Sequence, residues 1–155
     1  MESLSSYSGN FIRILVFAMA IVIVFAIFSR MFVYPPPLVE VKECSLTSDT
    51  VVSGTQTSIA ITLQSNDAKN AHSIKMEFSS HLLVSFLIGS RELEKTGTIW
   101  HYEETLESKA TYTTVINVLP TLESGVSKIT YRITIVIYRE GEQFFNKNLD
   151  LVVQL

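Results

Sequence analysis

Residues that could perform chemistry are few and widely spaced in this chain. Its 155 residues include one cysteine and three histidines, which are Cys44, His72, His81 and His101. A zinc site needs several ligands that converge on the ion, and the histidines show no paired spacing and have no neighbouring cysteine. The glycine-x-serine-x-glycine turn of serine hydrolases is also absent from the sequence. The sequence therefore predicts no catalytic residue, no metal site, no cofactor and no enzyme activity.

The single cysteine carries one structural expectation. Cys44 has no second cysteine in the chain with which to form a disulfide. A free cysteine usually behaves as a small apolar residue, so we expect Cys44 to be buried in the fold. The alternatives are a disulfide to another chain and a nucleophile pair with a distant histidine.

Acidic side chains gather in one part of the sequence. They are Glu92, Glu94, Glu103, Glu104 and Glu107. Carboxylate oxygens are the ligands that calcium and magnesium prefer, so one interpretation is a cation site. The other is a solvated rim, because Arg91, Lys95 and Lys109 are interleaved with the glutamates. We expect the rim.

Aromatic residues provide the candidate contacts for a protein partner. An outward-facing Trp100, with Tyr102 two residues later, would form a binding hot spot. The alternative for Trp100 is the core of the domain. Phe86 lies in the apolar run 82–88, which is either a buried strand or an exposed edge that accepts a strand from another protein. Trp100, Tyr102 and Phe86 are the candidate contacts.

Alternating polar and apolar residues predict the strands that would position these side chains. In residues 128–138, Ile or Tyr occupies every second position from Ile129 to Ile137, which is typical of a half-buried strand. Further strands are predicted at residues 38–46, 57–64, 73–78, 82–88, 98–103, 109–118 and 149–155. About seven or eight short strands predict an all-β domain at residues 38–155, an Ig-like antiparallel β-sandwich.

The N-terminal part of the chain is apolar and unlike the rest. Residues 14–28 contain no polar side chain, and with their flanks the apolar stretch covers residues 11–34. About 20 apolar residues cross a hydrocarbon core, so we predict a transmembrane helix after a short polar tail at 1–10. Residues expected within the span include Ile14, Phe17, Ile21, Phe25 and Phe28. The prolines at 35–37 cannot continue the helix and predict a short stiff spacer.

An uncleaved anchor has two alternatives. A cleaved signal peptide has an apolar region of comparable length, but residues 1–10 contain no lysine or arginine. No pair of small residues suitable for cleavage follows Phe28. A pilin-type leader, cut ahead of the helix, is suggested by the short polar start with Gly9, but the usual basic residue is missing.

The direction of the span is indicated by two opposing features. Positive charge marks the cytoplasmic side, and Arg30 with Lys42 outweighs Arg13, which slightly favours a cytoplasmic domain. The domain is, however, rich in serine and threonine and poor in lysine, a composition common in envelope modules. We expect a single-pass membrane protein with its C-terminal domain outside the cytoplasm.

The charge balance limits the possible partners. Twelve basic and 15 acidic residues give a net charge of −3, and the basic residues form no cluster. A nucleic-acid-binding domain would normally show a basic face, so no nucleic acid is expected. No small-molecule substrate is evident. The expected partners are the lipid bilayer, through the N-terminal helix, and an unknown protein or a second copy of the chain.

Two stretches of the domain follow an order seen in a known module family. Residues 53–78, SGTQTSIAITLQSNDAKNAHSIKMEF, give a turn, a strand and a polar loop, and residues 131–155, YRITIVIYREGEQFFNKNLDLVVQL, give a long strand, a glycine turn and an apolar strand. The domain thereby resembles CARDB-type, Ig-like modules of archaeal envelopes, with Asn66-Asp67 in place of asparagine-glycine. One span before one sandwich is also similar to archaeal flagellar stator proteins. The resemblance implies an envelope interaction module.

Two functions are consistent with these features. The first is a membrane-anchored Ig-like module that docks to an envelope partner or to copies of itself. The second is an accessory single-span subunit of a larger secretion, respiratory or motility complex. In that case Ala18, Ala20 and Ala26 would provide small surface for helix packing, although the sequence has no glycine-x-x-x-glycine motif.

Overall fold

The computed structural model describes residues 15–24, 26 and 36–155. Three residues predicted to lie in the span, Ile14, Phe25 and Phe28, fall outside these ranges, as do the residues on which the leader alternatives depend. The chain divides into two compact units, Met1–Pro36 and Pro37–Leu155, and each is treated by itself.

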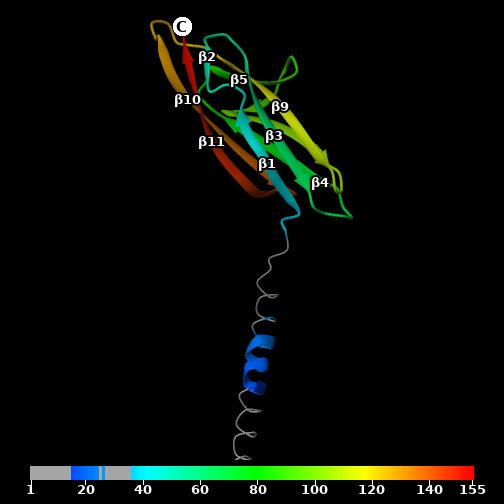
Figure 1. Ribbon diagram of the computed structural model, residues 1–155. Coiled ribbons are helices and arrows are strands. Elements are labelled where there is room, and N and C mark those ends of the chain that lie inside the picture. The colour runs from blue at the N-terminus through cyan, green and yellow to red at the C-terminus, as the bar shows by residue number, and fades with distance from the viewer. Residues whose placement is uncertain (1–14, 25, 27–35) are drawn as a thin grey trace, which may run out of the picture. The chain divides into compact units, whose positions relative to one another are not determined.

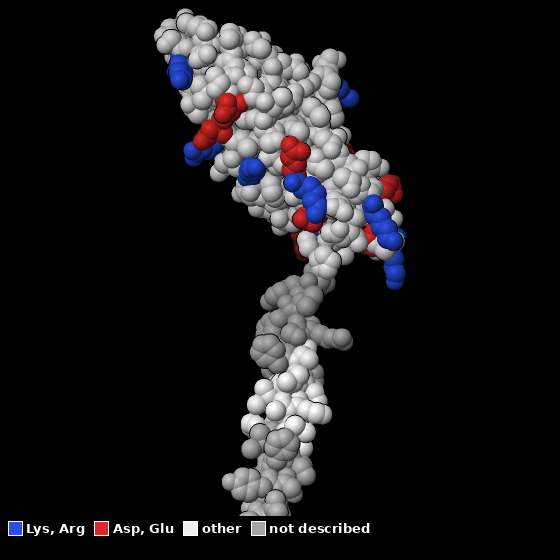
Figure 2. Space-filling model, viewed as in Figure 1, with Lys and Arg blue, Asp and Glu red and all other residues white. Residues whose placement is uncertain are grey.

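The described part of the N-terminal unit is an apolar helix. Residues 15–24 and Ala26 are helical, and they carry no charged side chain (Figure 2). The large apolar side chains from Leu15 to Val24, Phe17 and Ile21 among them, are each 52–70% exposed. Ten helical residues extend over about 15 Å, roughly half of a hydrocarbon core. No helix within the described residues is long and apolar enough to cross a membrane.

The C-terminal unit is built from strands β1 to β11 (Figure 1). They are β1 (Val39–Leu46), β2 (Thr50–Val52), β3 (Thr57–Ser65), β4 (His72–Ser79), β5 (Val84–Ile88), β6 (Arg91–Glu92), β7 (Glu94–Thr96), β8 (Ile99–Leu106), β9 (Thr111–Pro120), β10 (Lys128–Arg139) and β11 (Glu142–Gln154). The first sheet has the order β1-β3-β9-β5-β6, and the second has the order β2-β11-β10-β4-β8-β7. Neighbours pair antiparallel, except that β2 runs parallel to β11. The predicted all-β, two-sheet architecture is confirmed.

The core lies between the two sheets because every second residue of the longer strands points inward. In β10, Ile133, Ile135 and Ile137 are fully buried, and Tyr131 is nearly so. Strands β3 and β4 supply further fully buried side chains, namely Ile59, Ile61, Leu63, Ile74, Met76 and Phe78. Each such side chain contributes about 1.5–3 kcal/mol by leaving water.

Three strands and part of a fourth were not predicted from the sequence. Strands β2, β6 and β7 have only two or three residues each, too few for a recognisable alternation. Strand β11 begins at Glu142 rather than at residue 149. Its first half is polar and mostly exposed, so it lacks the apolar period that marks a strand with one buried face.

A tight turn joins β10 to β11, the longest antiparallel pair in the domain. Its two residues, Glu140 and Gly141, have φ angles of +50° and +83°. Positive φ at both positions is typical of the type I′ turn, which matches the twist of a hairpin. Glycine adopts this conformation readily, whereas Glu140 adopts it at a steric cost.

Candidate functional site

Two of the three predicted partner contacts lie in the core. Trp100 is 1% exposed and Phe86 is 0% exposed. Their rings meet edge to face with centroids 5.0 Å apart, and the Phe78 ring lies 5.4 Å from that of Phe86. The prediction that Trp100 and Phe86 contact a partner is therefore wrong, because the domain itself covers both side chains. The alternatives given above are confirmed: Trp100 lies in the core, and Phe86 lies in a buried strand, β5.

Tyr102 is half-buried and lines a cleft at one side of the sandwich. The cleft has a volume of about 320 Å³ and is formed by residues of β5 to β8 and their connections, including Arg91, Leu93 and Glu103. Burial raises the pKa of the Tyr102 phenol, and the neighbouring Glu104 carboxylate raises it further. The role of Tyr102 as a partner contact stays a prediction.

The acidic residues named above lie around this cleft, along β8 and in the turn that follows β8. Glu92, Glu94, Glu103 and Glu107 are exposed, and Glu104 is half-buried. Within the described residues, no group of three or more histidine, cysteine or acidic side chains is arranged to hold a metal ion.

A polar network crosses the outer face of the second sheet beside the cleft. The Glu77 carboxylate lies 3.0 Å from Lys75 Nζ and 3.5 Å from His101 Nδ1. It also accepts a hydrogen bond of 3.0 Å from the Tyr138 hydroxyl. Burial opposes ionisation of Glu77, but the contacts with Lys75 and Tyr138 hold its pKa below the usual value. The network thus keeps a carboxylate charged at the centre of the face.

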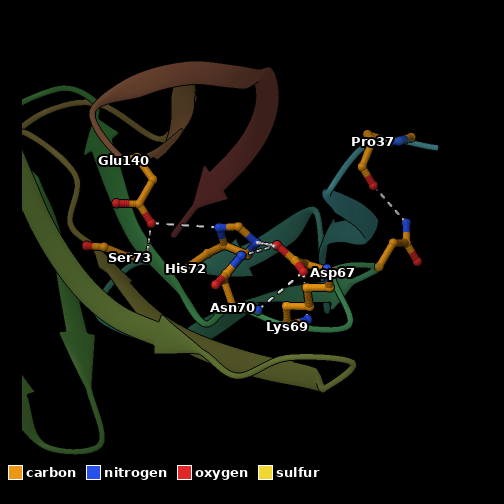
Figure 3. Close-up of polar contacts among 8 residues, drawn as sticks. Pro37, Asp67, Lys69, Asn70, His72, Ser73 and Glu140 are labelled. Atoms are coloured by element: carbon orange, nitrogen blue, oxygen red, sulfur yellow. Dashed lines mark hydrogen bonds and ion pairs between the residues drawn. The ribbon is translucent and has the colours of Figure 1, made fainter. Parts of the chain in front are cut away.

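A second polar cluster surrounds His72, which is only 6% exposed (Figure 3). Its Nε2 lies 3.2 Å from Asp67 Oδ2, and its Nδ1 lies 3.7 Å from Glu140 Oε1. The contact with Asp67 is short but poorly aligned, so His72 Nε2 has no well-formed hydrogen bond among the described residues. The hairpin turn of β10 and β11 thereby meets the loop before β4.

Asp67 is fixed by its own loop. Its Oδ1 accepts hydrogen bonds from the backbone N–H groups of Lys69 at 2.8 Å and Asn70 at 3.2 Å. This arrangement is an Asx turn, in which the side chain caps the following backbone. The N–H of Lys69, followed by those of Asn70, lowers the pKa of the Asp67 carboxyl, while partial burial opposes the shift.

The same loop holds the first residues of the domain. The backbone N–H of Asn66 donates to the Leu38 carbonyl at 2.8 Å, and its side-chain amide donates to the Pro37 carbonyl at 2.9 Å. Pro37 and Leu38 are therefore attached to the loop before β4. The polar loop was visible in the sequence, but nothing in the sequence linked His72 to Glu140.

Cys44 is buried, as predicted. Burial raises the pKa of its thiol, although the Lys147 ammonium acts in the opposite direction. Lys147 of β11 donates a 2.5 Å hydrogen bond to the Cys44 carbonyl on β1. A protonated, covered thiol is a poor nucleophile.

Comparison with known proteins identifies no family. No family model and no curated protein matches this sequence. Among solved structures, the chain is similar to Pseudomonas fluorescens alkylpurine DNA glycosylase AlkC (11% identity, TM-score 0.47, 76% of this chain and 31% of that one). It is also similar to the Bacillus subtilis sporulation control protein Spo0M (14% identity, TM-score 0.44, 76% of this chain and 50% of that one). A third similar structure is a PapD-like domain of human CEP192 (13% identity, TM-score 0.36, 79% of this chain and 89% of that one). The chain thus spans a third to a half of the first two.

Proposed function

We propose that this chain is a membrane-anchored interaction module. Its N-terminal apolar segment would be a transmembrane helix, and its Ig-like β-sandwich would dock to a protein of the cell envelope or of a membrane complex. The observation that carries this proposal is the helix at residues 15–24, whose large apolar side chains are each at least half exposed. A helix that is apolar on every side is stable only when lipid or other protein surrounds it.

The sequence supplies the length that a bilayer requires. The apolar stretch continues on both sides of the described helix, over residues 11–34. This length satisfies the requirement of about 20 residues, with Arg13 and Arg30 near the ends, where long side chains reach the headgroups. Three prolines follow, so a short segment joins the anchor to β1. Such a tether raises the effective concentration of the domain at the membrane.

An extracytoplasmic domain is supported by composition and by the resemblance to envelope modules. The domain is rich in serine and threonine, and its visible face carries acidic and basic side chains interleaved, without a large area of one sign (Figure 2). This surface suits recognition of another protein better than binding to nucleic acid.

An accessory subunit of a larger membrane complex is the alternative function. The same exposed apolar helix favours it, since Val, Ile and Phe side chains can pack on neighbouring helices as well as on lipid. The two functions differ in purification from native membranes. Stoichiometric co-purification with other membrane subunits supports the accessory role, whereas a chain that remains stable alone supports the independent module.

Membrane fractionation of the full-length chain tests the anchor. The wild-type chain is expected to stay in the membrane pellet after alkaline carbonate extraction. The double variant Phe17→Lys, Ile21→Lys is expected to move to the supernatant, because each lysine costs about 2.5–3.5 kcal/mol near the centre of a span. Leu82→Lys, at a domain residue that is 68% exposed, is the matched control and should stay in the pellet. Extraction of the wild type by carbonate would contradict the proposal.

A further inference from the structure

Strand β8 is unpaired along much of one edge. Strand β7 pairs with it only at Ile99, Trp100 and His101. Residues 102–106 therefore have no strand neighbour on that side within the part of the chain that the structure describes. An unpaired edge is a template for another strand, because its N–H and C=O groups lack partners in the sheet.

The direction of the unpaired groups follows from Ser73 in β4. The Ser73 carbonyl accepts from the Glu140 N–H at 3.0 Å, and the Ser73 N–H donates to the Glu140 side chain at 2.8 Å. Both groups of Ser73 thus point away from β8, and by alternation so do those of Lys75. Ser73 and Lys75 face Thr105 and Glu103 in the β4–β8 register. In such a pair both residues point outward, so Thr105 and Glu103 direct their N–H and C=O groups to the free edge.

The opposite edge of the second sheet, at β11 and β2, is protected against strand addition. There β11 is paired with β2 only at residues 152–154, and the Lys147 side chain reaches across to the Cys44 carbonyl on β1. A lysine on an edge strand is a common means of blocking strand addition. The nearest lysine to the start of β8, Lys95, instead lies 4.0 Å over the Trp100 ring.

Around the free edge, exposed carboxylates outnumber the basic side chains left for a partner. Lys75, which faces Glu103 in the β4–β8 register, contacts Glu77, and Lys95 lies over the Trp100 ring, so Arg91 and Lys109 remain. The exposed carboxylates beside it are Glu92, Glu94, Glu103 and Glu107, and none forms an ion pair with a described residue. Arg91 is the arginine that lines the adjacent cleft. A second copy that paired through the same edge would bring like carboxylates together, which is unfavourable. A segment with lysine or arginine side chains would complement them.

We propose that the edge of β8 from Tyr102 to Leu106 binds an extended, basic segment of a partner protein as an added strand in line with β7. The inference rests on the proposed docking function and names its class of partner. Glu103 and Thr105 provide the main-chain hydrogen bonds, and the surrounding glutamates bind the basic side chains. Apolar side chains of the segment enter the cleft at Leu93 and Tyr102.

Peptide binding to the full-length chain in detergent micelles tests this proposal. The probe is a fluorescent synthetic peptide that alternates lysine and valine, and binding is read from its anisotropy. Thr105→Pro removes the outward N–H but no hydrogen bond to β4, and proline is tolerated at such edge positions. We expect binding about tenfold weaker in Thr105→Pro. Thr105→Ala keeps the N–H and should bind as the wild type does.

A charge variant provides the second arm of the test. Glu103→Gln is expected to weaken binding several-fold at low salt and less at high salt, because the attraction is screened. Glu142→Gln, at an exposed residue on the β10–β11 hairpin, is the matched control and should have no effect. A peptide that alternates glutamate and valine should not bind.

Three results would overturn the inference: no binding of the lysine peptide to the wild type, equal binding of the glutamate peptide, or unchanged binding by both Glu103→Gln and a folded Thr105→Pro. Should Thr105→Pro fail to fold, as circular dichroism would show, the charge variant decides alone. If the chain binds the peptide but is extracted by carbonate, only the proposed membrane anchor is contradicted. If the chain stays in the membrane pellet but does not bind the peptide, only the proposed β8 binding site is contradicted.

Discussion

The Thr114 hydroxyl lies 2.9 and 2.8 Å from the two carboxylate oxygens of Glu104. Thr114 belongs to β9 in the first sheet and Glu104 to β8 in the second, so this contact joins the sheets where β8 has a free edge. The threonine is buried and the glutamate is half-buried. The contact therefore gives an inward-pointing carboxylate a partner inside the sandwich.

Loss of this contact should lower stability. In Thr114→Val the carboxylate keeps its position but loses a charge-assisted hydrogen bond, which we expect to cost about 1–2 kcal/mol at this half-exposed site. Thr114→Ser retains the hydroxyl and should lose less. Urea unfolding of the full-length chain in micelles, followed by the fluorescence of the single tryptophan, measures both. Equal stability of Thr114→Val and wild type would show that the contact contributes nothing.

Truncation of Phe86 separates a core role from a surface role. Because Phe86 is fully buried against Trp100 and Phe78, Phe86→Ala should destabilise the domain by about 3–5 kcal/mol. The control is Leu82→Ala, at an exposed position of the same stretch, which should change stability by less than about 0.5 kcal/mol. If Phe86→Ala unfolded at the same urea concentration as the wild type, the packing described for this ring would be incorrect.

The low pKa of Asp67 predicts a pH dependence of stability. Backbone N–H groups of Lys69 and Asn70 lower the pKa of Asp67 in the folded chain. A carboxyl with a lower pKa in the folded state stabilises it above the unfolded pKa of about 3.9, and this contribution is lost as the pH falls through the folded value. Asp67→Asn should therefore be less stable at neutral pH and lose less stability on acidification. Urea unfolding from neutral pH to about pH 2 would show parallel curves if Asp67 had no role.

Cys44 should resist modification in the folded chain. Its thiol is buried and its pKa is raised by that burial, so little reactive thiolate is accessible at neutral pH. We expect alkylation by iodoacetamide to be slow in the native chain and fast in urea, measured by mass spectrometry. Rapid alkylation of the folded chain would place the thiol at the surface.

The sequence predicted the strands that obey a simple period. Strands β3, β4 and β10 alternate cleanly, because one face of each packs on the core and the other meets solvent. Pattern alone could not orient β8. Its residues Trp100, His101 and Tyr102 are all amphipathic, so neither face was identifiable as the buried one before Trp100 was found in the core.

The polar sites depended on contacts distant in sequence. His72 meets Glu140 only because β4 and β10 are neighbours in the second sheet, and no local rule specifies which strands pair. The Asx turn at Asp67 is different, because it uses residues two and three positions later and lies in a loop that the sequence already indicated. Local geometry was thus predictable where long-range pairing was not.

Protease protection in intact cells tests whether the C-terminal domain lies outside the cytoplasm. A tag after Leu155 reports the domain in the full-length chain, and a cytoplasmic protein serves as the control for cell integrity. For an extracytoplasmic module we expect external protease to remove the tag from intact cells while the membrane-inserted segment remains in the pellet. Protection of the tag until the cells are permeabilised would contradict an extracytoplasmic docking module and direct the search for partners to the cytoplasm.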